Sequence, residues 1–239
     1  MHLRVILPVI GDTFRDATLR EVTEWAGPGT EVDLVTLRHG PASIESEYDE
    51  ALAGPGILER VHEADAQGVD AIFISCGADP AVAAAREIAS VPVVGGFEPA
   101  LMTALGLGER VGLLQVLPNV TPMLRSLARR YALAERFGPI RVIDVPVLSL
   151  EEHDVVGDAL HAQASAALEA REVDVFVLGC TGMIGMAARL QEQIAASGTF
   201  VPVVDPTAAA ITWLESQVRM GLRPSRTTYP IPPAKLRIG

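Results

Sequence analysis

Two cysteines are the residues of this chain best suited to acid/base chemistry. Cys76 and Cys180 are its only cysteines, and each ends an apolar run and precedes a short turn, in "VDAIFISCGADP" (69–80) and "VDVFVLGCTGMIG" (173–185). A thiolate is both a base and a nucleophile. Two thiols on opposite faces of one carbon could remove a proton from one face and deliver a proton to the other. We therefore expect the two sulfurs to face one cavity without forming a disulfide, and to invert a stereocentre without a cofactor.

The elements around each cysteine indicate an α/β fold. Short runs rich in Val, Ile and Leu alternate with amphipathic segments rich in Ala, Leu, Arg and Glu, which is typical of buried parallel strands separated by helices. The expected strands lie at 3–9, 31–37, 70–76, 91–97, 110–116, 141–148, 174–180 and 201–205.

The pattern of these runs repeats once along the chain. "RV" at 4–5 and "RV" at 110–111 each begin a unit with a second strand, a helix, a strand ending in the cysteine, another helix and "VPVV". The two cysteines are then equivalent positions in two four-stranded units, at the strand ends where ligands bind in open α/β sheets. We expect residues 1–97 plus 208–239 to form the first lobe and 98–207 the second, with the last helix (206–220) crossing back.

The turns after the cysteines suggest how the thiols are activated. Asp79 and Pro80 are suited to the cap and first turn of the helix after Cys76, and Thr181 or Gly182 to the start of the helix after Cys180. A thiol at a helix N-terminus has its pKa lowered toward neutrality. The exposed amides around Gly77 and Thr181 could also donate hydrogen bonds to a developing enolate.

Composition excludes several classes of function. The formal charge of −11 argues against a nucleic-acid partner, and no apolar run approaches the ~20 residues of a membrane span. We expect no signal peptide and a cytoplasmic location with reduced thiols. Lys235, in the proline-rich tail, is the only lysine, and there is no GxGxxG, HExxH or CxxC motif. We therefore expect no cofactor and no metal.

Several stretches resemble the aspartate/glutamate/hydantoin racemase superfamily, and within it the hydantoin and allantoin racemase branch. They are "GPASIESEYDEALAGPGIL" (40–58), "SCGADPAVAAAREIASVPVVG" (75–95), "LGCTGM" (178–183) and "TYPIPPAK" (228–235). The resemblance covers most of the chain. It implies two lobes of flavodoxin-like type with the active site between them, cofactor-independent racemization with Cys76 and Cys180 as acid/base residues, and a homo-oligomer.

Residues on the loops at the cysteine-bearing edge are candidates for binding a small-molecule substrate. The first loop departs from the hydantoin racemase pattern, because "LPVIGDTF" keeps Pro8 but has Val9 and Ile10 where polar residues are usual. This apolar pair indicates a less polar substrate. The candidates are Pro8, Ile10, Ser43, Glu45, Gly77, Phe97, Asn119, Thr121 and Thr181. Glu45 could instead be a solvated loop residue, and Asn119 and Thr121 a turn with a helix cap.

Our interpretation is a racemase or epimerase acting on 5-monosubstituted hydantoins or allantoin. The alternatives are a maleate-type cis–trans isomerase that uses a covalent cysteine adduct, an aspartate or glutamate racemase, a decarboxylase of the arylmalonate type, and a non-catalytic small-molecule binding protein. A Cys-His hydrolase is disfavoured, because the five histidines lie away from the cysteine-bearing strand ends.

Overall fold

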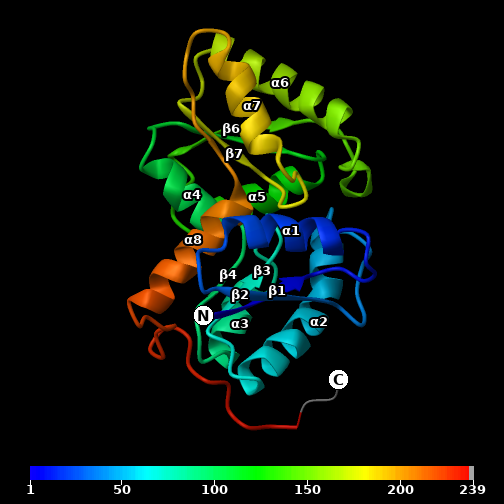
Figure 1. The fold of residues 1–239 in the computed structure, drawn as a ribbon, viewed down its shortest axis with the longest axis vertical. Coiled ribbons are helices and arrows are strands. Elements are labelled where there is room, and N and C mark those ends of the chain that lie inside the picture. The colour runs from blue at the N-terminus through cyan, green and yellow to red at the C-terminus, as the bar shows by residue number, and fades with distance from the viewer. Residues whose placement is uncertain (237–239) are drawn as a thin grey trace.

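The computed structural model describes residues 1–236 and contains two four-stranded parallel sheets. The first has the strand order β2-β1-β3-β4 and the second the order β6-β5-β7-β8. The identical order confirms the predicted α/β fold of two pseudo-symmetric lobes (Figure 1). Residues 237–239 of the expected first lobe lie outside the described residues.

The first sheet comprises β1 (His2–Leu7), β2 (Glu31–Thr36), β3 (Ala71–Ile74) and β4 (Val93–Val94), and the second comprises β5 (Val111–Gln115), β6 (Phe137–Val142), β7 (Val175–Leu178) and β8 (Val203–Val204). The central strands are buried along nearly their whole length, as expected where helices cover both faces of a sheet. This burial explains their continuous apolar sequences.

One strand prediction was wrong in position. The run at 141–148 was expected to be a strand, but β6 spans Phe137–Val142 and pairs with β5. Beyond Val142 the N–H groups of Ile143 and Val145 still donate to the Gln115 and Val116 carbonyls, but the positive φ of 57° at Asp144 and the missing N–H of Pro146 end the regular strand. The rest of the run forms the short 3₁₀ helix η1 (Val147–Ser149), which brings Val147 over the site.

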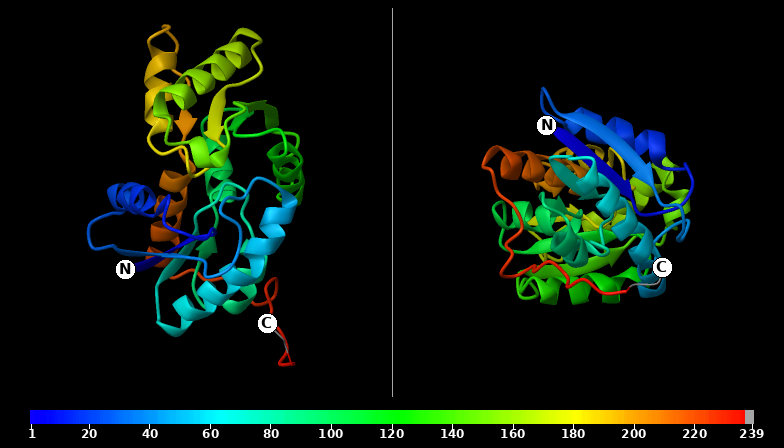
Figure 2. Two further views of the ribbon diagram at one scale, coloured as in Figure 1. Left: turned by 90° about the vertical axis from the view of Figure 1, so that its right-hand side faces the viewer. Right: turned by 90° about the horizontal axis from the view of Figure 1, so that it is seen from below.

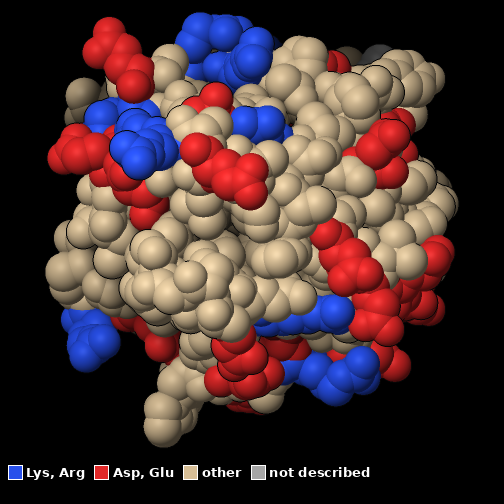
Figure 3. Space-filling model, turned by 90° about the horizontal axis from the view of Figure 1, so that it is seen from above, with Lys and Arg blue, Asp and Glu red and all other residues tan. Residues whose placement is uncertain are grey.

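The helices are α1 (Arg15–Trp25), α2 (Glu47–Ala66), α3 (Val82–Ile88), α4 (Phe97–Leu105), α5 (Val120–Arg130), α6 (His153–Glu169), α7 (Met186–Ala195) and α8 (Pro206–Arg219). None of them, within the described residues, is long and apolar enough to cross a membrane. On the face seen in Figure 3, basic and acidic side chains are interspersed. Arg189 on α7 pairs with Asp154 on α6 at 3.1 Å and joins two helices of the second lobe.

Two helices cross between the lobes. α4 follows the last strand of the first sheet but packs against β5, β7 and β8 of the second, whereas α8 follows the last strand of the second sheet and packs against α1 and β3 of the first. Figure 2 shows the lobes stacked with α8 alongside the first. This exchange places the carboxyl ends of β3 and β7 at the same interface. The exact lobe boundaries stay a prediction.

Candidate active site

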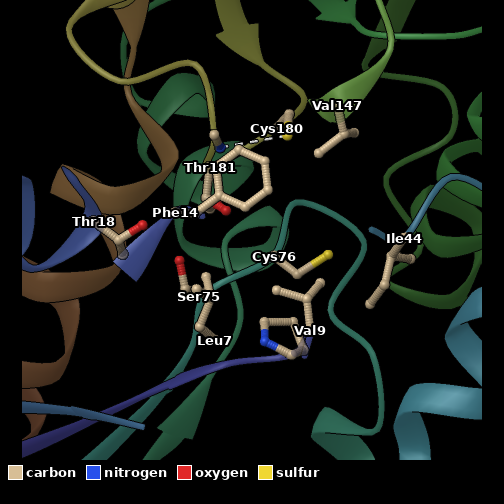
Figure 4. Close-up of a pocket in the computed structure, with 12 residues that line it drawn as sticks. Leu7, Val9, Phe14, Thr18, Ile44, Ser75, Cys76, Val147, Cys180 and Thr181 are labelled. Atoms are coloured by element: carbon tan, nitrogen blue, oxygen red, sulfur yellow. Dashed lines mark hydrogen bonds between the residues drawn. The ribbon is translucent and has the colours of Figure 1, made fainter. Parts of the chain in front are cut away.

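Cys76 and Cys180 line one cavity between the lobes. Each follows the end of its central strand, β3 or β7, and the cavity that they share has a volume of about 50 Å³. Both are half-buried free thiols. Figure 4 shows the two side chains reaching the cavity from opposite lobes. The prediction that the sulfurs face one cavity without a disulfide is confirmed.

The two cysteine loops touch each other through glycines. A Cβ atom built on Gly77 would lie 2.1 Å from the carbonyl oxygen of Gly179 and 3.2 Å from the Cα of Cys180. No real side chain tolerates such a contact with backbone, so glycine is required after Cys76 for the lobes to approach this closely. Gly77 was expected to contact the substrate, but it is not among the residues that line the cavity. Its visible role is to let the two loops meet.

The expected helix starts were wrong at both cysteines. α3 begins at Val82 and α7 at Met186, each six residues after the cysteine. The residue before each helix is left-handed, Ala81 with φ 56° and Gly185 with φ 72°. The chain therefore makes an extra turn between thiol and helix, and neither thiol lies in the first helical turn where the helix dipole acts.

Asp79 caps a different helix from the one predicted. Its carboxylate accepts hydrogen bonds from the backbone N–H groups of Phe97 (2.7 Å) and Glu98 (3.1 Å) at the start of α4, and from the Tyr131 hydroxyl of the second lobe (3.0 Å). Its backbone is left-handed, with φ 51°. Burial raises the pKa of Asp79 to about 6 despite these donors. One carboxylate thus ties the Cys76 loop to α4 and to the other lobe.

The pKa of each thiol is raised, contrary to the prediction that it would fall toward neutrality. Burial is the main cause for Cys76, and the negative charge that Cys180 carries when ionised raises its pKa further. Burial raises the pKa of Cys180 to about 11, against a hydrogen bond of 3.4 Å donated to its Sγ by the Gly182 N–H. Desolvation in the interface therefore outweighs the nearby amides. Because one thiolate disfavours the other, the pair favours states with at most one negative charge.

The cavity has an apolar wall and a hydroxyl-bearing wall. The apolar side chains are Leu7, Val9, Phe14, Ile44 and Val147, and the hydroxyls belong to Thr18, Ser75 and Thr181. Figure 4 shows Ile44 and Val147 on one side of the cysteines and the three hydroxyls on the other, with Leu7 beside Ser75 and the ring of Phe14 beside Thr181. The Ser75 side chain is 3% exposed, and its Oγ has no hydrogen-bond partner among the described residues. A buried hydroxyl of this kind in a cavity is ready to bind a polar group of a ligand.

A hydrogen bond joins the lobes over the cavity. The Val147 N–H donates to Glu45 Oε1 at 2.8 Å. The loop that carries Glu45 is held by Asp49, whose carboxylate accepts from the Glu45 N–H and the Ser46 hydroxyl. Ile44 and Val147, which line the cavity, are therefore brought together by Glu45 rather than by direct apolar packing alone.

The structure brings only part of the predicted binding set to the cavity. Pro8 and Thr181 line it, and Glu45 lies directly behind the lining. Ile10 is 40% exposed and does not line the cavity, whereas its neighbour Val9 does. The ring of Phe97 is buried against Tyr131, with ring centroids 6.2 Å apart, and so belongs to the core.

Ser43, Asn119 and Thr121 also lie outside the lining of this cavity. Asn119 is at the start of α5 without a side-chain cap, and Thr121 accepts a hydrogen bond from Gln115 Nε2 at 3.0 Å. Whether any of these residues contacts substrate stays a prediction.

Sequence reasoning missed several lining residues, namely Leu7, Phe14, Thr18, Ile44, Ser75, Val147 and Gly182. The sequence did point to Ser75 as a site residue, because a hydroxyl at the end of an otherwise apolar strand and next to Cys76 is unusual. The sequence held no such signal for Phe14 and Thr18, since they reach the cavity only because α1 packs on β2 and α8.

Fold and site together define a two-lobed α/β protein with one cysteine from each lobe at a shared interface cavity. The family model described as "Asp/Glu/Hydantoin racemase" matches residues 11–214. This chain belongs to the Asp/Glu/hydantoin racemase family, a family of isomerases. It is 33% identical to a hydantoin racemase of Rhizobium meliloti over 100% of this chain and 98% of that protein. It is 35% identical to a hydantoin racemase of Pseudomonas sp. (strain NS671) over 88% of this chain and 83% of that protein.

A solved structure supports the same branch of the family. The allantoin racemase from Klebsiella pneumoniae has a TM-score of 0.94 to this chain and is 32% identical, with 100% of this chain and 96% of that chain covered. The similarity therefore extends over both lobes and the interface between them.

Proposed function

We propose that this protein is a cofactor-independent racemase that inverts the carbonyl-activated C5 stereocentre of a 5-monosubstituted hydantoin or of allantoin, with Cys76 and Cys180 as its two acid/base residues. The observation that carries this proposal is the pair of free thiols facing one cavity from opposite lobes. Identity of 30% or more to hydantoin racemases and to an allantoin racemase supports the substrate class.

The proposed step needs one thiolate and one thiol. The thiolate takes the proton from C5 and becomes a thiol, the electron pair of the C–H bond moves into the enolate, and the second thiol protonates the opposite face and becomes the thiolate. Burial makes each thiolate a stronger base, and repulsion between the sulfurs disfavours a doubly ionised pair. The reaction uses the singly ionised pair, which the raised pKa values make a minor form of the free protein near neutral pH.

The two walls of the cavity support a compact, partly polar substrate. A hydantoin ring has carbonyl and N–H groups on one side that match hydroxyls such as those of Ser75 and Thr181, and its substituent matches the apolar wall. The Gly182 N–H, which already contacts the Cys180 sulfur, is a further donor beside the site of charge development.

Isotope exchange in D₂O tests this two-base mechanism. With wild-type protein, the product enantiomer should carry deuterium at C5 at early times, while unconverted substrate keeps its hydrogen. Cys76→Ser and Cys180→Ser should each lose net racemization, because a serine hydroxyl is too weak a base near neutral pH. Each variant should still exchange the C5 hydrogen of one enantiomer, and the two variants should select opposite enantiomers.

Two outcomes would contradict the proposal. A Cys76→Ser variant that racemizes at nearly the wild-type rate would remove the second base. A covalent cysteine–substrate adduct detected by mass spectrometry, with dependence on one thiol only, would replace racemization by addition chemistry. Circular dichroism of each variant checks that it folds.

A further inference from the structure

A second cavity lies beside the cavity of the two cysteines. It has a volume of about 400 Å³ and is bounded by α1, by the loop that follows Cys180, and by Asp205 before α8. Phe14 and Gly182 line both cavities, so these two residues form the boundary between them. In Figure 4 the Phe14 ring stands next to Thr181 at this boundary. The larger cavity is thus placed to receive a group that extends from the reacting centre, or a separate small ligand.

The larger cavity contains a buried carboxyl group with one unpaired oxygen. Glu21 on α1 is 6% exposed, and its Oε2 has no hydrogen-bond partner among the described residues. Asp205 lines the same cavity and uses one oxygen, Oδ1, to accept from the N–H groups of Thr207 and Ala208. Burial and then the charge of Asp205 raise the pKa of Glu21 to about 8. The Thr207 side chain and the Gly185 backbone lower this pKa without offsetting the two larger effects. Ionising Glu21 beside Asp205 is therefore costly, and no salt bridge to either carboxyl group offsets the cost among the described residues.

The rest of the lining indicates what would relieve this cost. Phe14 and Trp25 supply aromatic surface, and Trp25 is 46% exposed. The other charged or titratable lining residues are exposed, namely Arg20, Glu24, Glu151 and His153. Arg20 forms no salt bridge with Glu21 or Asp205 among the described residues. An ammonium group on a short apolar stem matches both features, since it donates hydrogen bonds to carboxylates and is attracted to aromatic faces.

We propose that the cavity lined by Glu21, Asp205, Phe14 and Trp25 is a binding subsite for an organic ammonium group. The group comes either from the C5 substituent of the substrate or from a separate small amine. The first source rests on the proposed racemase function, and the second does not. Glu21 binds the ammonium as a carboxylate, so a proton leaves Glu21 for solvent when the cation enters.

A matched pair of substrates tests the first source. 5-(3-Aminopropyl)hydantoin and 5-butylhydantoin have substituents of the same length, one cationic and one neutral. The wild-type protein should have the higher kcat/KM for the amine, and Glu21→Gln should lower the ratio of the two kcat/KM values about tenfold or more. The ratio cancels any effect that Glu21 has on Cys180, whose pKa its charge raises. Asp16→Asn, an exposed carboxyl of α1 outside this lining, is the matched control and should leave the ratio within about twofold.

A titration with n-butylammonium tests the second source without using catalysis. If a free amine is the ligand, it should raise the Tm of wild-type protein by ~3 °C near saturation and release protons, seen as a binding heat that depends on the buffer's ionisation enthalpy. Glu21→Gln should lose both signals, and Asp16→Asn should keep both. An unchanged substrate ratio together with absent or Glu21-independent amine binding would overturn the proposal. If neither hydantoin is racemized, the proposed function fails, and the amine titration alone decides the subsite.

Discussion

Replacing Gly77 by alanine should separate the two cysteine loops. The new Cβ atom would lie 2.1 Å from the Gly179 carbonyl oxygen and 2.7 Å from its carbonyl carbon, and both are backbone atoms that cannot rotate away. Since real Cβ contacts essentially never fall below 3.0 Å, the loops must move apart by at least about 0.9 Å. The thiols on these loops would then be about 1 Å too far apart for a carbon held between them.

The size of the effect follows from that displacement. A misplacement of about 1 Å between reacting groups costs on the order of 100-fold in rate, so Gly77→Ala should lower kcat by about that factor and KM by much less. Overpacking of this kind also costs about 1–3 kcal/mol, which lowers the Tm of a chain of this length by roughly 2–12 °C. Polarimetry of a 5-monosubstituted hydantoin and thermal unfolding measure the two effects on one preparation.

Gly54→Ala is the matched control. Gly54 lies in α2, and apart from its chain neighbours nothing comes within 4 Å of the added Cβ, so its replacement should leave the cysteine loops in contact and racemization unchanged. Pro55 follows Gly54 and disfavours a helical alanine before it, so no gain in helix stability is expected. If Gly77→Ala keeps kcat and Tm within error of wild type, the close contact of the loops does not set the distance between the thiols, and the reasoning is refuted.

Three further predictions concern single side chains. Ser75→Ala should not destabilise the protein, because the Ser75 Oγ has no hydrogen-bond partner to lose. It should lower kcat/KM about tenfold or more in steady-state assays, and unchanged kinetics would show that Ser75 does not bind the substrate. Tyr131→Phe should cost ~1–2 kcal/mol in urea unfolding through the lost bond to Asp79, and no loss would show that this bond does not hold the lobes. Because the pKa of Glu21 is raised to about 8 in the folded state, folded protein holds a proton that unfolded protein releases between about pH 4.5 and 8. The free energy of unfolding should therefore fall by more than ~1 kcal/mol from pH 5 to 8, and Glu21→Gln should flatten this slope; equal slopes would contradict the raised pKa.

Local sequence pattern was enough to predict the α/β fold, the duplication and the equivalent positions of the two cysteines. Buried parallel strands leave continuous apolar runs, and those runs ended at Cys76 and Cys180 in both copies. Because carboxyl ends of neighbouring parallel strands share one edge, the position of each thiol followed from its own unit. The interlobe cavity followed from the symmetry of the repeat.

Tertiary packing decided the chemistry of that cavity. Asp79 was expected to cap its own helix but caps α4, because the chain turns left-handed at Asp79 and Ala81. The thiols were expected to be acidified by helix dipoles, but each helix begins six residues later and burial between the lobes raises both pKa values. Hydrogen-bond geometry and desolvation depend on which surfaces meet, and no window of sequence contains that information.

The contrast is clearest at four residues. The sequence by itself determined that Cys76 stands at the end of a buried strand, because a strand's period and apolarity are local properties. Only the tertiary structure decided that Gly77 must be glycine, since the clashing carbonyl belongs to Gly179, 102 residues further along the chain. It also decided that Phe97 belongs to the core and that Phe14 lines the site, because α4 packs on the second sheet and α1 packs on β2 and α8.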